Sequence, residues 1–163
     1  MTSGEFFKHP FPPLFNENSR VLILGSFPSV KSREEGFFYG HPQNRFWKLI
    51  ALLTNSPVPQ SIPEKKTLIL SNGLALWDSI ASCTVFGSSD SSIRDVVPND
   101  LSPLIKGSKI QKVFCNGKLS YNCYHKYAQP LTGIPAVLLP STSPANAAWS
   151  LDRLAKAWSV IFD

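Results

Sequence analysis

The 163-residue sequence contains little cysteine or histidine, and their positions argue against metal and redox chemistry. Cys83, Cys115 and Cys123 form no Cys-x-x-Cys pair, so they cannot supply a disulfide framework or the thiolates of an iron–sulfur cluster. The three histidines, at positions 9, 41 and 125, lack the spacing of metal ligands. We therefore expect buried structural cysteines, and neither a metal nor a cofactor.

Long apolar runs and common catalytic motifs are also missing. No stretch approaches the length needed to span a bilayer, and "MTSGEFFKHPFPPLF" at the N-terminus does not resemble a signal peptide. The sequence has no Gly-rich nucleotide motif, phosphate-loop lysine or nucleophile elbow. A nucleophilic pair of Cys115 or Cys123 with His41 remains open. We expect an intracellular, cytoplasmic protein.

Length and charge indicate a small globular protein with an anionic partner. Hydrophobic residues make up 43% of the chain, which favours one folded domain over residues 1–163, with 1–17 as an N-terminal extension packed on it. The formal net charge is +5, which favours nucleic acid as a partner. Because lysine and arginine are scattered along the sequence, any basic surface must be assembled by folding.

Four short apolar runs predict the strands of a parallel sheet. They are continuously apolar rather than alternating, which is typical of strands buried on both faces. Helices are expected between them, from Asn44 onward and over 118–128, whereas "IPEKKTLILSNG" (62–73) suits a short helix or, in part, a strand. This alternation predicts an α/β fold with helices on both faces of the sheet. The four runs are 20–26, 73–80, 110–117 and 134–141.

Polar segments follow these strands and should meet at one edge of the sheet. "GSFPS", "WDS", "CNG" and "PSTSPAN" each come directly after an apolar run. In open parallel sheets, ligands bind beyond the carboxyl ends of the strands. The sequence therefore predicts a functional site at this edge. The long loop 27–43 should belong to it, because loops of this length are usually functional.

Two helices have recognisable starts. Asn44 precedes an apolar face formed within residues 46–53, and it could cap that helix through its side-chain oxygen. Ser143 followed by Pro144 is typical of an N-cap and first turn, so the last helix is expected to begin there. Its apolar stripe should pack in the core and comprises Leu151, Leu154, Ala155, Trp158 and Ile161 or Phe162.

Several polar residues permit two interpretations. Asn44 either only caps a helix or also orients a water or ligand through an amide that donates and accepts hydrogen bonds. Tyr39 is either a core residue or a flat surface on which a base can stack. Asp78 either caps a turn or lines a pocket. Asp90, within "SDSS" (89–92), is expected in a loop.

Three ordered motifs resemble the uracil-DNA glycosylase superfamily, and most closely its hypoxanthine-DNA (deoxyinosine) glycosylase branch. They are "VLILGSFPS", "YGHPQNRFWKLI" and "LLPSTSPANA", and the resemblance covers about residues 18–160. It implies a three-layer α/β/α fold around a four-stranded, mainly parallel sheet. It also implies hydrolysis of the N-glycosidic bond of a deaminated base, most of all hypoxanthine, in DNA. The resemblance also implies that no metal, iron–sulfur cluster or other cofactor is needed, and it suggests a monomer associated with the nucleoid.

The resemblance points to Asn44 as the catalytic residue. The mismatch-specific branch carries a catalytic asparagine where this sequence has Phe27, and the classical uracil enzymes use an aspartate in that motif. The classical enzymes also carry a histidine in the last motif, where this sequence has Ser141. In the hypoxanthine branch, the catalytic amide belongs to the His-Pro-x-Asn motif, which here ends in Asn44. Its amide would position the water that attacks C1′ of the sugar.

The same resemblance implies how the base and the DNA are held. Tyr39 would stack on the flipped base, the backbone at Ser26 and Phe27 would bind the base oxygen, and Asp78 would read the base edge. The loop "STSPANA" would grip phosphates at a helix N-terminus. The expected base-binding set is Ser26, Phe27, Tyr39, Asp78 and Ser141, and the expected DNA-binding set is His41, Ser143 and Asn146.

Three other functions remain open from the sequence. The protein could be a mismatch-type uracil-DNA glycosylase, or a non-catalytic member that binds DNA through the same edge, since a fold alone does not determine chemistry. A small-molecule N-glycoside hydrolase is the third. The basic net charge favours the DNA-binding alternatives.

Overall fold

A parallel sheet of four strands, in the order β3-β2-β6-β7, forms the centre of the computed structural model, which describes residues 4–86 and 93–163. All three strand pairings in this sheet are parallel. Each strand falls inside one of the four predicted apolar runs, so this part of the fold prediction is confirmed. The strands are β2 (Val21–Gly25), β3 (Leu74–Asp78), β6 (Lys112–Asn116) and β7 (Ala136–Leu139).

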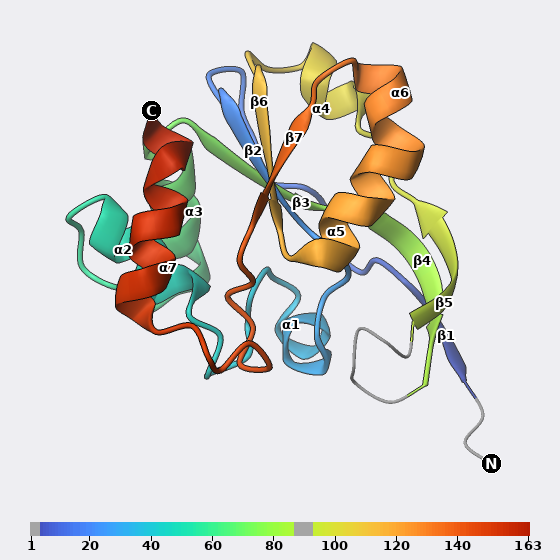
Figure 1. Cartoon of the computed structure of the whole chain (residues 1–163), viewed down its shortest axis with the longest axis horizontal. Helices are drawn as coiled ribbons and strands as arrows, with labels where there is room; N and C mark the ends of the chain where they lie inside the picture. The colour runs from blue at the N-terminus through green and yellow to red at the C-terminus, as the bar shows by residue number, and fades with distance from the viewer. Residues whose placement is uncertain (1–3, 87–92) are drawn as a thin grey trace.

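Helices cover both faces of this sheet and make the three layers visible in Figure 1. The ambiguous segment 62–73 is helical, because the Ser61 hydroxyl accepts the Glu64 N–H at its N-terminus. On one face lie α2 (Phe46–Leu53), α3 (Ile62–Ser71) and α7 (Leu151–Trp158), which continues as the 3₁₀ turn η3 (Ser159–Phe162). On the other lie α5 (Lys118–Cys123), the π-helical η2 (Tyr124–Ala128) and α6 (Gln129–Thr132).

Two short helices complete the set in the described residues. The helix α1 (Val30–Glu35) lies within the long loop 27–43, and Ser29 is its N-cap, with its hydroxyl accepting the Ser32 N–H. The helix α4 (Ser102–Lys106) lies between β5 and β6. The loop after β2 is therefore partly helical, and Figure 1 shows α1 at the end of the molecule where β2 stops.

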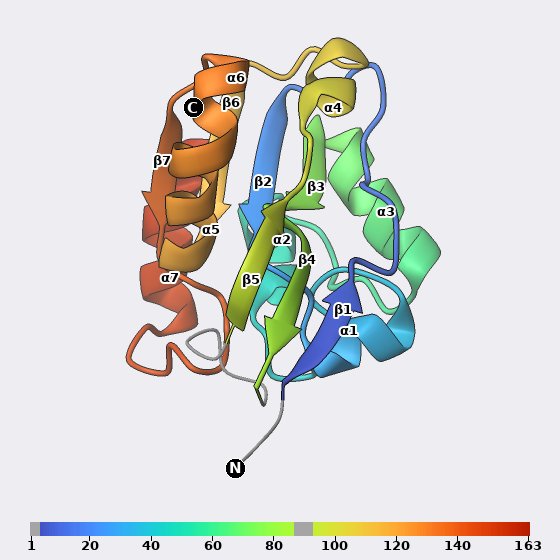
Figure 2. The ribbon, with the colours of Figure 1, turned by 90° about the vertical axis from the view of Figure 1, so that its right-hand side faces the viewer.

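A second sheet, which the sequence reading did not predict, stands beside the first (Figure 2). It is antiparallel, with the order β1-β4-β5. The chain passes from β3 into β4 through the single residue Ser79, so Asp78 lies at the junction of the two sheets. The expected loop 89–92 with Asp90 lies outside the described residues. The strands are β1 (Glu5–Lys8), β4 (Ile80–Val85) and β5 (Ile93–Pro98).

The predicted start of the last helix at Ser143 is wrong. The helix α7 begins at Leu151, and Ser150 is its N-cap, with its hydroxyl accepting the Arg153 N–H. The Ser143 hydroxyl instead accepts the Ala145 N–H in a turn. Serine before proline favours this local turn as well as a helix cap. The expected apolar stripe does pack in the core, with Leu154 and Trp158 fully buried.

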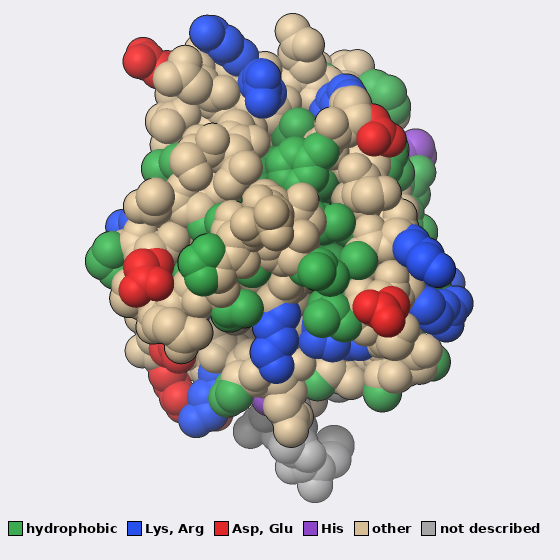
Figure 3. All heavy atoms as spheres, turned by 90° about the vertical axis from the view of Figure 1, so that its left-hand side faces the viewer, with side chains coloured by type: hydrophobic (Ala, Val, Ile, Leu, Met, Phe, Trp, Pro, Cys, Tyr) green, Lys and Arg blue, Asp and Glu red, His purple; other side chains and the backbone are tan. Residues whose placement is uncertain are grey.

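The face of the molecule formed by α2, α3 and α7 carries its charged side chains in separate places. Figure 3 shows lysine and arginine side chains at several points around this face, without one continuous basic patch. Within residues 4–86 and 93–163, none of the helices has the length and apolar character required to cross a bilayer.

The indole of Trp158 joins α7 to the sheet, so we expect Trp158→Ala to destabilise the protein strongly. The side chain is fully buried, packs edge-on against Phe46, and donates from Nε1 to the Pro140 carbonyl oxygen at 2.9 Å. Its removal should lower the free energy of unfolding by about 3–5 kcal/mol, measured by denaturant titration. Phe162→Ala is the control, because that ring is 42% exposed, and it should cost less than about 1 kcal/mol. An equal loss of unfolding free energy in the two variants would contradict the role assigned to Trp158.

Candidate active site

A cavity of about 160 Å³ lies at the carboxyl ends of β2, β3 and β6. An engineered protein cavity of about 150 Å³ binds benzene, so this volume suits a planar ring. The cavity brings together seven of the nine predicted site residues; His41 and Asn146 do not line it. The seven are Ser26, Phe27, Tyr39, Asn44, Asp78, Ser141 and Ser143.

The Asn44 side chain is held by two donors just before helix α2 begins. Its Oδ1 accepts the backbone N–H of Phe46 at 3.0 Å and the hydroxyl of Thr142 at 2.8 Å. A carbonyl oxygen has two lone pairs, so Oδ1 is fully used. The Nδ2 group donates to none of the described residues. Because Asn44 lines the cavity, Nδ2 is available to donate a hydrogen bond to a ligand. Asn44 therefore satisfies a helix-terminal N–H and still offers a donor.

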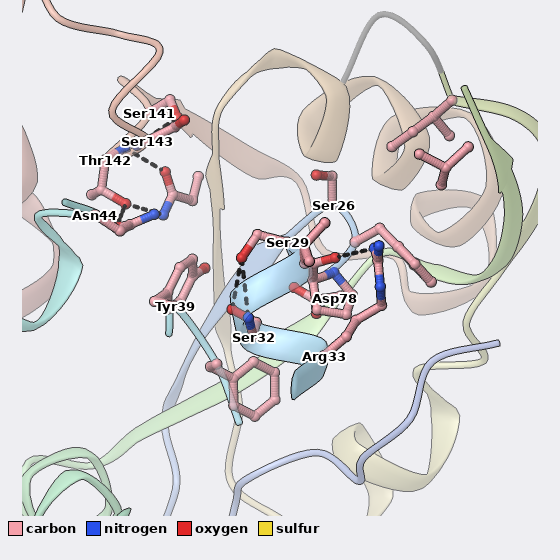
Figure 4. A pocket seen from close by; sticks show the side chains of 18 residues that line it. Ser26, Ser29, Ser32, Arg33, Tyr39, Asn44, Asp78, Ser141, Thr142 and Ser143 are labelled. Atoms are coloured by element: carbon pink, nitrogen blue, oxygen red, sulfur yellow. Dashed lines mark hydrogen bonds between the residues drawn. The ribbon is translucent and has the colours of Figure 1, made fainter. Parts of the chain in front are cut away.

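Asn116 and Thr142 orient Asn44, and the sequence reading missed both. Asn116 Nδ2 donates to Thr142 Oγ1 at 3.0 Å, while Asn116 Oδ1 accepts the Thr142 backbone N–H at 3.0 Å. The Thr142 hydroxyl then donates onward to Asn44 (Figure 4). Asn116 ends β6 inside "CNG", so the strand-end rule that selected Asp78 could also have selected this residue. Nothing in the sequence singled out Thr142.

Tyr39 lies between the two sides of the cavity in Figure 4. One face of its ring stacks on Phe46, with centroids 4.1 Å apart. Its hydroxyl is buried without a hydrogen-bond partner in the described part of the chain. Burial, and then the charge of Asp78, raise the pKa of Tyr39, so its hydroxyl keeps its proton. The backbone is held at φ 53°, which is uncommon outside glycine and typical of functional positions.

The loop after β2 offers two backbone donors to the cavity. The N–H groups of Ser26 and Phe27 donate to none of the residues that the structure describes. Both residues line the cavity, where an amide without a protein acceptor can donate to a ligand or to water. This geometry agrees with the role that the resemblance implies for them. They can stabilise negative charge on an oxygen atom placed in the cavity.

Asp78 is a buried carboxylate at the end of β3, where it lines the cavity. Its Oδ2 lies 2.7 Å from Nε2 of His9, and the two side chains are only 5% and 4% exposed. Its backbone carbonyl oxygen accepts a hydrogen bond from Asn99. Capping a turn therefore does not account for the position of the Asp78 side chain, which lines the cavity and contacts His9. The sequence reading missed His9 because this residue is 69 positions away from Asp78.

The loop 141–149 is held from inside by Arg45. The Arg45 guanidinium donates to the carbonyl oxygens of Ser143, at 2.9 Å, of Asn146, at 3.0 Å, and of Trp149. Asn146 Nδ2 donates to the Ser141 carbonyl oxygen, so its side chain is used within the loop. Since α7 starts at Leu151, residues 143–146 do not form the expected helix N-terminus, and their contact with DNA stays a prediction.

Two further predictions concern the outside of the cavity and the thiols. His41 lies outside it, and its Nδ1 accepts the Gln43 N–H in a turn. Burial raises the pKa of the Cys115 thiol to about 12 and also raises the pKa of Cys123. Neither is activated as a thiolate, so a nucleophilic cysteine paired with His41 loses its support. In the described residues, no group of three or more possible ligands is placed to hold a metal ion.

Arg33 adds a positive charge to the cavity and was not among the predicted site residues. Its guanidinium lies 4.2 Å from the ring centre of Phe7 and donates to the Pro28 carbonyl oxygen at 2.9 Å. A guanidinium held in this way at a cavity wall suits an anionic ligand such as a DNA phosphate.

Comparisons with known proteins identify the family of the chain. The family model described as "Uracil DNA glycosylase superfamily" matches residues 12–161. Proteins named hypoxanthine DNA glycosylase from Methanosarcina acetivorans and Methanosarcina barkeri are each 33% identical, over 95% of this chain and 98% of theirs. A solution NMR structure from M. acetivorans, named as a candidate uracil DNA glycosylase, superposes with a TM-score of 0.82 at 31% identity, covering 97% of this chain and 98% of that one. The chain therefore belongs to the uracil DNA glycosylase superfamily.

Proposed function

We propose that the protein is a monofunctional DNA glycosylase that removes hypoxanthine from DNA by hydrolysing the N-glycosidic bond of deoxyinosine. One observation carries this proposal: a ring-sized cavity combines two free backbone donors, one buried carboxylate and one oriented amide. The names of the two archaeal relatives support hypoxanthine as the base.

The groups around the cavity are complementary to the edge of hypoxanthine. The base has to leave the duplex, at a cost of a few kcal/mol that is smallest for mispaired bases. Its O6 would accept from the Ser26 and Phe27 N–H groups, and its N1–H would donate to Asp78. The face of the Tyr39 ring that is not stacked on Phe46 would support the base. Uracil carries a similar oxygen next to an N–H, so it is the natural second substrate to test.

The chemistry we propose needs no metal. As the glycosidic bond lengthens, negative charge grows on the departing purine, and the Ser26 and Phe27 N–H groups stabilise it through O6. Asn44 Nδ2 donates to the attacking water and fixes its position at C1′. The water oxygen bonds to C1′ and one water proton ends on the base. The products are free hypoxanthine and an abasic deoxyribose.

We further propose that the chain acts as a single domain and as a monomer on DNA, in the cytoplasm and at the nucleoid. The net charge of +5 supports DNA binding, and Arg33 places part of that charge at the cavity. His41, Ser143 and Asn146 stay candidates for DNA contacts outside the base pocket. Binding of this kind weakens as salt rises, because phosphate contacts release counterions.

The direct test of the function is base release from defined DNA. The protein is incubated with duplexes that hold one hypoxanthine, uracil or xanthine, with free inosine in parallel, and alkali then reveals abasic sites as strand breaks. We expect breaks at hypoxanthine and little cleavage of free inosine. Failure to release any of the bases would overturn the enzymatic proposal and favour a non-catalytic DNA-binding protein. Cleavage of inosine alone would indicate a small-molecule hydrolase.

Asn44 can be tested with a substitution that keeps its structural contacts. In Asn44→Asp, one carboxylate oxygen can still accept from Phe46 and Thr142, but the donor Nδ2 is lost. We expect single-turnover base release to fall about 100-fold or more, while the affinity for the duplex changes little. Gln43→Ala, at the exposed neighbouring position, should keep the wild-type rate. A wild-type rate for Asn44→Asp would remove its amide from the mechanism.

Arg45 should affect both stability and activity, because three loop carbonyl oxygens depend on it. We expect Arg45→Met to lower the free energy of unfolding by about 2–4 kcal/mol and to weaken duplex binding. The measurements are denaturant titration and a gel-shift titration. Lys48→Met is the matched control, since Lys48 is an exposed cation in α2, three residues after Arg45. A loss of affinity as large in Lys48→Met would show that charge alone is responsible.

A further inference from the structure

His9 stands outside the family motifs, yet it contacts the buried carboxylate of the cavity. We propose that His9 is a positioning residue for base selection: it holds Asp78 as a fixed hydrogen-bond acceptor for the N–H of a deaminated purine. This inference rests on the proposed function. It assigns a role to the N-terminal strand β1, which the motif-based reading treated as an extension.

The backbone delivers His9 to Asp78 by sheet pairing. The strand β1 pairs with β4, and directly after β1 the His9 N–H donates to the Ala81 carbonyl oxygen at 2.8 Å. Asp78 lies two residues before β4 in the chain. The two side chains are therefore brought together by the antiparallel sheet, independently of the loops that carry Tyr39 and Asn44.

The surroundings of His9 indicate where its proton lies. The imidazole is enclosed by aromatic rings, with Trp77 and Phe11 centred 4.4 and 4.5 Å from it. Its Nδ1 is buried and has no hydrogen-bond partner in the described residues. A buried N–H without an acceptor costs free energy, so the neutral tautomer with the proton on Nε2 fits this site. That proton is donated to Oδ2 of Asp78, because a carboxylate can only accept.

The second oxygen of Asp78 lies beside a glycine of the cavity wall. A Cβ atom at Gly25 would lie 2.4 Å from Asp78 Oδ1, so Oδ1 lies directly over this glycine, which itself lines the cavity. No side chain in the described residues donates a hydrogen bond to Oδ1. With His9 on Oδ2, the carboxylate cannot rotate freely, and Oδ1 keeps one direction toward a bound base.

This arrangement distinguishes hypoxanthine from adenine. Hypoxanthine presents an acceptor at O6 and a donor at N1, which match the backbone donors of Ser26 and Phe27 and the acceptor Asp78. Adenine presents the reverse, a donor at N6 and an acceptor at N1. In a buried site, both mismatches leave polar groups unpaired, and such sites discriminate strongly. Fixing Asp78 thus protects undamaged adenine as well as binding the deaminated base.

The experiment compares His9→Leu, His9→Gln, Asp78→Asn and the double variant of His9→Leu with Asp78→Asn in single-turnover release of hypoxanthine. We expect His9→Leu to lower the rate about tenfold or more, because it leaves Asp78 without its donor. In His9→Gln the side-chain amide can replace Nε2 as donor, so the rate should recover to within a few-fold of wild type. Adding His9→Leu to Asp78→Asn should reduce the rate less than twofold further, since His9 acts through Asp78.

Two controls separate this role from a loss of folding. His9→Leu should bind a duplex with a stable abasic-site analogue as tightly as wild type, because that ligand has no base for Asp78 to contact. His125→Leu removes an exposed histidine that does not line the cavity and should change nothing. If His9→Leu fails to fold, a His9→Gln rate as low as that of Asp78→Asn overturns the inference.

The outcomes also separate this inference from the proposed function. If the wild-type protein releases no hypoxanthine, the proposed function itself fails. If it releases hypoxanthine but His9→Leu matches wild type, only the role of His9 fails. If the rate losses of His9→Leu and Asp78→Asn multiply in the double variant, His9 does not act through Asp78 and has a structural role instead. A loss of affinity of His9→Leu for the abasic analogue would lead to the same conclusion.

Discussion

The candidate site depends on one chain of hydrogen bonds, from Asn116 through Thr142 to Asn44. It joins the end of β6, the loop after β7 and the start of α2, three segments that are far apart in the sequence. Thr142 is fully buried at its centre, and its hydroxyl accepts from one amide and donates to the other. Because each member has its partner, the chain allows one orientation of the Asn44 amide. The position of the catalytic candidate is thus a property of the sheet as much as of its own helix.

The parallel sheet and much of the cavity could be predicted because they follow from local patterns. The strand Val21–Gly25 has no polar side chain since helices cover both faces of the sheet, and the end of a parallel strand determines where the next polar residue lies. This rule correctly placed Ser26, Asp78 and Ser141 at one edge. Asn44 illustrates the limit of such patterns. Its position before an apolar helix left both a cap and a ligand-orienting amide open, and the family resemblance is what pointed to catalysis.

The features that were missed depend on long-range pairing. The segment 5–8 is short and mostly exposed, so nothing in its sequence indicates an edge strand of an antiparallel sheet. The position of His9 could not be predicted either, because this strand places it beside Asp78. The turn at Ser143 was mistaken for a helix start because serine before proline favours both. What decides between them is Arg45, whose guanidinium binds three carbonyl oxygens in a loop about 100 positions later in the chain. Local propensity contains no information about such a partner.

Selectivity for a deaminated base requires groups whose hydrogen-bonding roles cannot be exchanged. A hydroxyl can donate or accept, so it accommodates adenine as readily as hypoxanthine. Backbone N–H groups such as those of Ser26 and Phe27 only donate, and a carboxylate such as Asp78 only accepts. Asn44 belongs to the same pattern, because two donors occupy its oxygen and leave it a donor toward the cavity. The N–H groups and the carboxylate therefore have one role by their own chemistry, and Asn44 has one role through its neighbours. These fixed roles let a small pocket recognise a chemical change of a single base.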